Sequence, residues 1–143
     1  MKNHFTQFIL FAVMFALVLA LTSCAGTPDT DSLWKNSLYQ TDTSFGSGSV
    51  TVSVVVKAGE KSVTFTLNTD KDTLGEALME YGLIDGDMGE YGLYLKKANG
   101  ITADYDADGA YWSFNDENGN MMPVGVDGAK INNGEKYELV YTK

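Results

Sequence analysis

The chain has 143 residues, of which 10 are Lys or Arg and 19 are Asp or Glu, so its net charge is −9. No segment carries a basic cluster, which argues against nucleic acids and anionic lipid headgroups as partners, because both require a concentrated positive surface. The only cysteine is Cys24 and the only histidine is His4, so disulfides, thiolate nucleophiles, Ser-His-Asp triads and histidine-bound zinc are excluded from the rest of the chain.

Residues 1–23 are predicted to be a lipoprotein signal peptide. Lys2 stands before 14 consecutive apolar residues, Phe8 to Leu21, whereas a helix that spans a bilayer needs roughly 20. This length is typical of a signal peptide that is removed after export.

Cys24 is the predicted site of lipid attachment. Leu21-Thr22-Ser23-Cys24 resembles the bacterial lipobox, in which the signal peptidase cuts before a cysteine that carries diacylglycerol. Acyl chains hold a soluble domain at a bilayer because each buried methylene contributes about 0.8 kcal/mol. The sequence therefore predicts a lipid anchor at the extracytoplasmic face of the cell membrane. The alternative is an ordinary signal peptide with an incidental cysteine.

Residues 24–48 are predicted to hold the lipidated cysteine followed by a flexible tether or an extension of the fold. Their content of Ser, Thr, Asp and Gly is typical of a linker. Large apolar side chains nevertheless recur between Leu33 and Phe45, and a disordered linker rarely keeps so many. Two alternatives stay open for this stretch, a free tether and a segment that lies back on the domain.

The predicted domain, residues 49–143, begins with a β-hairpin. Residues 50–57 are β-branched almost throughout, Ala58-Gly59-Glu60 forms a turn signal, and residues 61–67 alternate polar and apolar side chains.

A helix is predicted next. Asp72 or Thr73 can cap its first turn, and apolar side chains recur at spacings of three and four residues as far as Tyr81. Gly82 is expected to end it.

The second half is predicted to be a loop followed by further strands. Residues 85–92, rich in Gly and Asp, are expected to form the loop, with strands at 93–98, 110–115 and 137–142 and a short strand weighed at 122–125. The order predicts an α+β fold, a β-grasp-like mixed sheet with a single packed helix.

Three pieces of the second half carry a family resemblance. They are Tyr91-Gly92-Leu93-Tyr94 with Ala98-Asn99-Gly100-Ile101, then Tyr111-Trp112, then Val124-Gly125-Val126-Asp127 with Ile131-Asn132-Asn133-Gly134-Glu135 and Tyr137. Their order and spacing resemble the transcobalamin-like C-terminal domain, which closes over vitamin B12 in animal cobalamin carriers and recurs alone in bacterial lipoproteins. The resemblance implies a corrinoid such as cobalamin as ligand. The large helical domain of the animal carriers has no counterpart here, and Glu135 stands where the family usually has Asp.

The resemblance also places a ligand surface on one hairpin. It implies that an apolar planar ligand rests on Trp112, Phe114, Met121 and Met122, with Tyr94 as a further candidate. The alternative is packing, because strand alternation puts Trp112 and Phe114 on one face that has to be largely buried if Tyr111 and Ser113 are not.

A calcium loop is a second candidate site. Asp104, Asp106 and Asp108 reproduce the opening D-x-D-x-D-G of an EF-hand loop. Asn115 stands where the bidentate Glu is expected, and strands rather than helices are predicted around the loop. A solvated acidic turn is the alternative, as it is for Asp85, Asp87 and Glu90.

These features predict a small ligand-binding domain at the membrane, which captures a corrinoid or another small molecule for uptake and passes it to a transporter or envelope protein. The alternative is an envelope protein-protein interaction module without a small-molecule ligand, which pairs with its partner through an edge strand. No motif places a pair of catalytic groups, so we expect no enzymatic activity.

Overall fold

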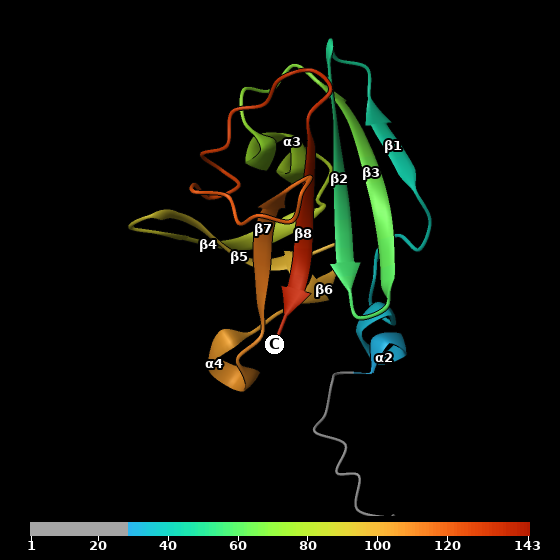
Figure 1. The fold of residues 1–143 in the computed structure, drawn as a ribbon, viewed down its shortest axis with the longest axis vertical. Coiled ribbons are helices and arrows are strands. Elements are labelled where there is room, and N and C mark those ends of the chain that lie inside the picture. Colours follow the sequence, from blue (N-terminus) through green and yellow to red (C-terminus); the bar gives the residue numbers. More distant parts are fainter. Residues whose placement is uncertain (1–28) are drawn as a thin grey trace, which may run out of the picture.

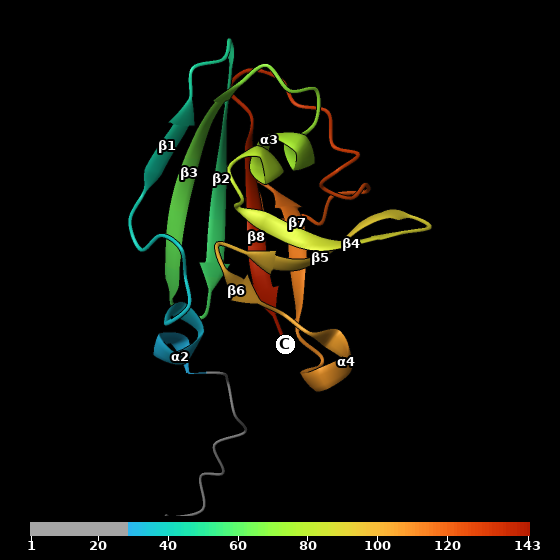
Figure 2. The ribbon, with the colours of Figure 1, turned by 180° about the vertical axis from the view of Figure 1, so that it is seen from behind.

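A computed structural model describes residues 29–143 of the chain, which fold into two β-sheets with a helix beside them (Figures 1 and 2). The predicted signal peptide and Cys24 lie outside these residues. The elements in chain order are α2 (Thr30–Trp34), β1 (Thr43–Gly46), β2 (Val50–Ala58), β3 (Lys61–Thr69), α3 (Leu74–Glu80), β4 (Ile84–Gly89), β5 (Gly92–Ala98), β6 (Ile101–Thr102), α4 (Tyr105–Asp108), β7 (Tyr111–Asp116) and β8 (Lys136–Thr142).

The larger sheet has five strands in the order β1-β3-β2-β8-β7. β2 and β3 form the predicted antiparallel hairpin, in which Val54 lies opposite Phe65. β2 also pairs with β8 in parallel, and β8 pairs with β7 in antiparallel fashion. Alternate residues of β2 and β3 are buried, because a pleated strand turns every second side chain toward the core.

Helix α3 packs against one face of this sheet, as predicted (Figure 2). Thr73 caps it, and a reciprocal hydrogen bond from the backbone of Thr73 to the Glu76 carboxylate completes a capping box. Leu74, Ala77 and Leu78 are buried. Gly82, with φ of +64°, takes the chain out of the helix in a conformation that favours glycine.

The smaller sheet contains a strand where the sequence predicted a loop. Residues 85–92 form most of β4 and the turn into β5, and the order of this sheet is β4-β5-β6. The loop prediction was wrong because an exposed strand needs no alternation of apolar residues, and three glycines obscured the pattern.

The α+β class with a single packed helix is confirmed, although the strands form two sheets. At Met122 to Gly125 the structure has no strand; the preceding residue, Met121, forms an isolated bridge with Asn115.

Residues 29–46, here called the strap, lie on the domain. Trp34 is 4% exposed, and its indole N–H donates a hydrogen bond of 2.8 Å to the Ala58 carbonyl. β1 then pairs in parallel with β3. The strap thus supplies both an edge strand and a buried tryptophan to the core.

Asn99 fastens the middle of the strap. This fully buried side chain accepts a hydrogen bond of 2.9 Å from the Tyr39 backbone N–H and donates one of 2.8 Å to the Tyr39 carbonyl. Its φ of +49° is one that asparagine tolerates better than most residues. The Tyr39 ring then packs edge-on against Phe45 and Phe65.

Within residues 29–143, no helix is both long enough and apolar enough to cross a membrane.

Candidate functional site

Two of the five predicted ligand residues belong to the core. Trp112 is 6% exposed and Phe114 is 9% exposed. The Trp112 indole donates a hydrogen bond of 3.2 Å to the Ile101 carbonyl, while the Phe114 ring lies 5.5 Å from that of Tyr137. In β7, therefore, Trp112 and Phe114 are the pair that faces the core, which is the packing alternative.

The other three residues are more accessible. Met121 is exposed and Met122 is half-buried against the core, with its backbone N–H bonded to the Phe114 carbonyl. Tyr94 lies on the outer face of β5, and the Lys96 ammonium is 5.9 Å from its ring centroid. The predicted set thus divides between core and surface and does not form one binding face.

One piece of the family resemblance forms a polar network at the start of β8. The Glu135 carboxylate accepts hydrogen bonds from the Asn132 backbone N–H at 2.8 Å and from the Tyr137 hydroxyl at 2.5 Å. Burial alone would raise the pKa of Glu135, but these hydrogen bonds outweigh it and lower the pKa. Burial and the neighbouring Glu135 both raise the pKa of Tyr137. This network is structural, because it fixes the turn that leads into β8.

A second piece of the resemblance joins a loop to the helix and to the β4–β5 hairpin. The Gly75 N–H, in the first turn of α3, donates a hydrogen bond of 2.8 Å to the Val126 carbonyl. A Cβ on Gly75 would lie 2.7 Å from Asp127 Cα, and one on Gly92 would lie 2.6 Å from the Asp127 carboxylate. Val126 and Asp127 therefore lie against the helix, and Asp127 also lies against the hairpin; glycine at positions 75 and 92 leaves the room for this approach.

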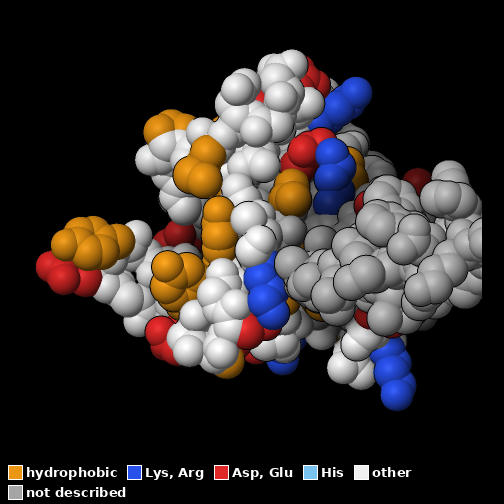
Figure 3. All heavy atoms as spheres, turned by 60° about the horizontal axis from the view of Figure 1, so that its bottom comes forward, with side chains coloured by type: hydrophobic (Ala, Val, Ile, Leu, Met, Phe, Trp, Pro, Cys, Tyr) orange, Lys and Arg blue, Asp and Glu red, His pale blue; other side chains and the backbone are white. Residues whose placement is uncertain are grey.

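Large apolar side chains are exposed around this junction. Tyr91 is 95% exposed at the turn between β4 and β5, and Met88 is 72% exposed beside it. Figure 3 shows hydrophobic and acidic side chains together on the hairpin tip, which projects at the left of the view. We call the exposed apolar residues of the hairpin and of the loop after β7 the hairpin–loop surface; its members are Met88, Tyr91, Tyr94, Met121 and Val124. It includes both faces of the hairpin, because Met88 lies opposite Leu93 whereas Tyr94 lies opposite Asp87.

Sequence reasoning missed Met88, Tyr91 and Val124. The signal that was available is a pair of large apolar residues between glycines in Met88-Gly89-Glu90-Tyr91-Gly92. Large apolar side chains that stay exposed at a hairpin tip bury little within their own hairpin, and exposed apolar groups of this kind are candidates for contact with a ligand or partner.

The hairpin also carries acidic charge. Asp85, Asp87 and Glu90 are all exposed. The Lys96 ammonium forms an ion pair of 2.5 Å with Asp87, and this hydrogen bond raises the pKa of Lys96. Apolar and acidic side chains are therefore neighbours on the hairpin, since Asp87 lies directly opposite Tyr94.

Two of the three carboxylates of the predicted calcium loop have other partners, those of Asp104 and Asp108. Residues 105–108 form the short helix α4, and the Asp104 carboxylate caps it through the N–H groups of Asp106 and Ala107. Asp108 forms an ion pair of 2.8 Å with Lys143, whose hydrogen bond lowers the pKa of Asp108. Among the described residues, no three His, Cys, Asp or Glu side chains are grouped closely enough to hold a metal ion.

Comparison with solved structures finds the same fold in other proteins. A candidate metal-binding protein from Ruminococcus gnavus ATCC 29149 is 29% identical with a TM-score of 0.61, over 66% of this chain and 97% of that one. Haptocorrin in complex with Cbi is 20% identical with a TM-score of 0.50, over 69% of this chain. No family model and no curated protein sequence matches the chain.

These matches support the transcobalamin-like fold expected from the sequence. The aligned part of this chain spans 26% of the haptocorrin chain, so the likeness is to one part of that carrier. At 20% identity, this likeness establishes the fold alone.

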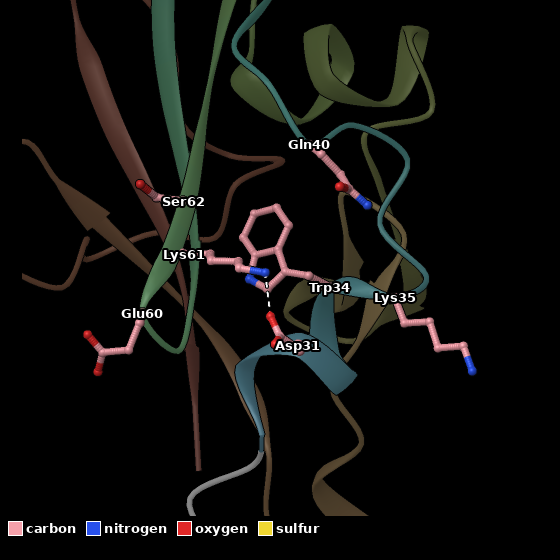
Figure 4. Close-up of a pocket in the computed structure, with 7 residues that line it drawn as sticks. All are labelled: Asp31, Trp34, Lys35, Gln40, Glu60, Lys61 and Ser62. Carbon is pink, nitrogen blue, oxygen red and sulfur yellow. Dashed lines mark hydrogen bonds and ion pairs between the residues drawn. The ribbon is translucent and has the colours of Figure 1, made fainter.

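A hollow of about 610 Å³ lies at the end of the domain where the strap begins (Figure 4). Lys61 crosses it to form an ion pair of 2.5 Å with Asp31, and Trp34 lies behind that pair (Figure 4). Its lining residues are Asp31, Trp34, Lys35, Gln40, Glu60, Lys61 and Ser62. Its wall is mainly polar and charged, which contrasts with the apolar hairpin–loop surface.

Proposed function

We propose that this protein is a membrane-anchored extracytoplasmic lipoprotein whose domain binds a small molecule, with a corrinoid as the favoured class, for delivery to an uptake system. The observation that carries the proposal is the likeness of the fold to haptocorrin, a protein whose structure holds Cbi. The anchor is Cys24, and no catalytic role is proposed.

The hairpin–loop surface is the proposed binding region. A corrin ring is broad and flat, and tyrosine rings and methionine thioethers suit the face of such a ligand. Tyr91 and Tyr94 lie three positions apart and are both exposed, so each can contact a ligand without prior rearrangement of the core. Because the surface projects from the domain, it would cover one face of a ligand, which favours modest affinity over tight capture.

Titration of the chain from Cys24 to Lys143 with cobinamide tests this proposal. We expect a shift of the corrin absorbance bands and a rise in Tm. The double variant Y91A and Y94A should weaken the apparent affinity for cobinamide at least tenfold. Tyr105 is the matched control, because it is 60% exposed but lies on α4. Cobinamide binding that is absent, or equally weakened by Y105A, would refute the assignment.

The anchor is tested separately. C24A is expected to abolish incorporation of a lipid precursor and to move the protein from the membrane fraction to the soluble fraction. Unchanged fractionation would refute the anchor without bearing on ligand binding.

A second candidate function is docking to another envelope protein. The observation that favours it is the exposure of Tyr91 beside Glu90 and Asp87, since an aromatic anchor bordered by charge is typical of protein interfaces. β1 and β7 are also the two edge strands of the larger sheet. A photo-crosslinking residue at position 91 would distinguish the two functions. Formation of a protein adduct in cells, together with no cobinamide binding in the titration, would favour docking.

A further inference from the structure

Few residues separate Cys24 from the folded domain. The strap begins at Asp29 and Thr30, where the Thr30 hydroxyl accepts a hydrogen bond of 3.2 Å from the Glu60 N–H. Five residue steps separate Cys24 from Asp29. An extended chain of five residues spans at most about 18 Å. Any acyl group on Cys24 therefore lies close to this end of the domain.

Several elements meet at this end, which we call the base. It consists of α2, the turn at Gly59 and Glu60, α4 and the C-terminal Lys143, which lie together at the lower end of both Figures 1 and 2. A Cβ on Gly59 would lie 2.2 Å from the Thr30 hydroxyl oxygen, so the turn and α2 are in direct contact. The opposite end, the top, holds the turns at Gly48 and Gly134, which bond to Asn68 and Thr51 respectively.

We infer that the base lies against the lipid headgroups of the bilayer, held there by the length of the tether and not by charge. The inference rests on the proposed anchor at Cys24. Carboxylates outnumber lysines at the base, and Lys61 and Lys143 are already in ion pairs with Asp31 and Asp108. The base therefore offers no attraction for anionic lipid. Its charged groups are Asp29, Asp31, Lys35, Glu60, Lys61, Asp104, Asp106, Asp108 and Lys143.

This placement sets the direction in which the hairpin–loop surface points. β4 and β5 lie across the direction of β2 and β8, and the hairpin tip projects to one side of the domain (Figure 1). With the base on the bilayer, the tip points along the membrane and the top points away from it. The hairpin–loop surface would then be open to molecules and proteins at the membrane surface.

The placement can be measured on the chain from Cys24 to Lys143, coupled through its single thiol to a maleimide lipid in phosphatidylcholine bilayer discs. Chemical coupling supplies the anchor whether or not the cell acylates Cys24. A negative result here would therefore overturn the placement of the base without refuting the proposed function. With a gadolinium-chelating headgroup lipid in the disc, we expect amide relaxation enhancement at Asp31 and Glu60 to exceed that at Gly48 and Gly134 several-fold. Equal enhancement at both ends, or a larger effect at the top, would overturn the inference.

Two controls separate tether length from charge. Twenty Gly and Ser residues inserted after Gly26 are expected to remove most of the difference between base and top, and persistence of the difference would overturn the role of the tether. The uncoupled chain is expected not to sediment with vesicles of phosphatidylcholine or of phosphatidylcholine and phosphatidylglycerol. Sedimentation with the anionic vesicles would show attraction by charge and overturn the inference that the tether alone holds the base at the bilayer.

Discussion

The β2–β3 and β4–β5 hairpins use the same antiparallel pairing but differ in what their side chains do. In β2 and β3 every second residue is buried, and Val54, Phe65 and Leu67 are fully enclosed. In β4 only Ile84 is buried, and exposure increases toward the turn at Tyr91. The first hairpin lies in the middle of the larger sheet, whereas the tip of the second projects from the domain and presents apolar groups to solvent. The comparison separates the part of the molecule that stabilises the fold from the part available for contact.

The largest effect expected from this difference is on stability. F65A should lower the free energy of unfolding by about 3–5 kcal/mol, because it leaves a cavity beside Tyr39 and Phe45. M88A should change it by less than about 0.5 kcal/mol, because Met88 is 72% exposed. Urea unfolding followed by tryptophan fluorescence measures both. Comparable losses in the two variants would mean that the hairpin tip is also part of the stabilising core.

A smaller effect is expected from the backbone of the second hairpin. A Cβ on Gly86 would lie 2.1 Å from the Tyr94 carbonyl oxygen, so G86A should force β4 and β5 apart and cost about 1–3 kcal/mol. Gly89 is the matched control, because a Cβ there would lie 3.7 Å from its nearest neighbour, the Gly92 carbonyl oxygen. Hydrogen exchange of the β5 amides should accelerate in G86A and remain unchanged in G89A. Faster exchange in both variants would show that the hairpin opens for reasons unrelated to this contact.

The same difference explains how much the sequence revealed. Residues 50–57 are β-branched almost throughout, Val63, Phe65 and Leu67 alternate with polar neighbours, and Thr73 precedes a helical pattern, so the first hairpin and α3 were predictable. β4 was not predictable, because the side chains of a projecting strand need not alternate between a buried and an exposed face. The pairing of Asn99 with Tyr39, which are 60 positions apart, has no local pattern at all, so the place of the strap stayed open. For the candidate site, the alternation in β7 required one of two residue pairs to be buried without deciding which, and no periodicity marks an exposed Tyr91.

The strap offers the next prediction, since it joins the two hairpins. N99A removes two hydrogen bonds and leaves the Tyr39 backbone N–H and carbonyl without these partners, which should cost about 1–3 kcal/mol. S37A is a suitable control, because the Ser37 hydroxyl bonds only to the Trp34 carbonyl within the same segment. Limited proteolysis should cut the strap of N99A sooner than that of the S37A protein. Equal resistance of the two variants would mean that the aromatic cluster alone holds the strap.

The smallest effect expected is a pH dependence at the start of β8, the strand that pairs with the first hairpin. The hydrogen bonds to Glu135 lower its pKa in the folded state below the value of 4.5 that is usual for the free group. The ionised form therefore contributes stability that is present above about pH 4.5 and is lost as the pH falls through the lower, folded-state pKa. The Tm difference between wild type and E135Q should be largest near neutral pH and should shrink at lower pH, because protonation gives the wild type the same uncharged group. A difference that stays constant from pH 7 to pH 3 would mean that the shape of the side chain, rather than its charge, fixes the turn.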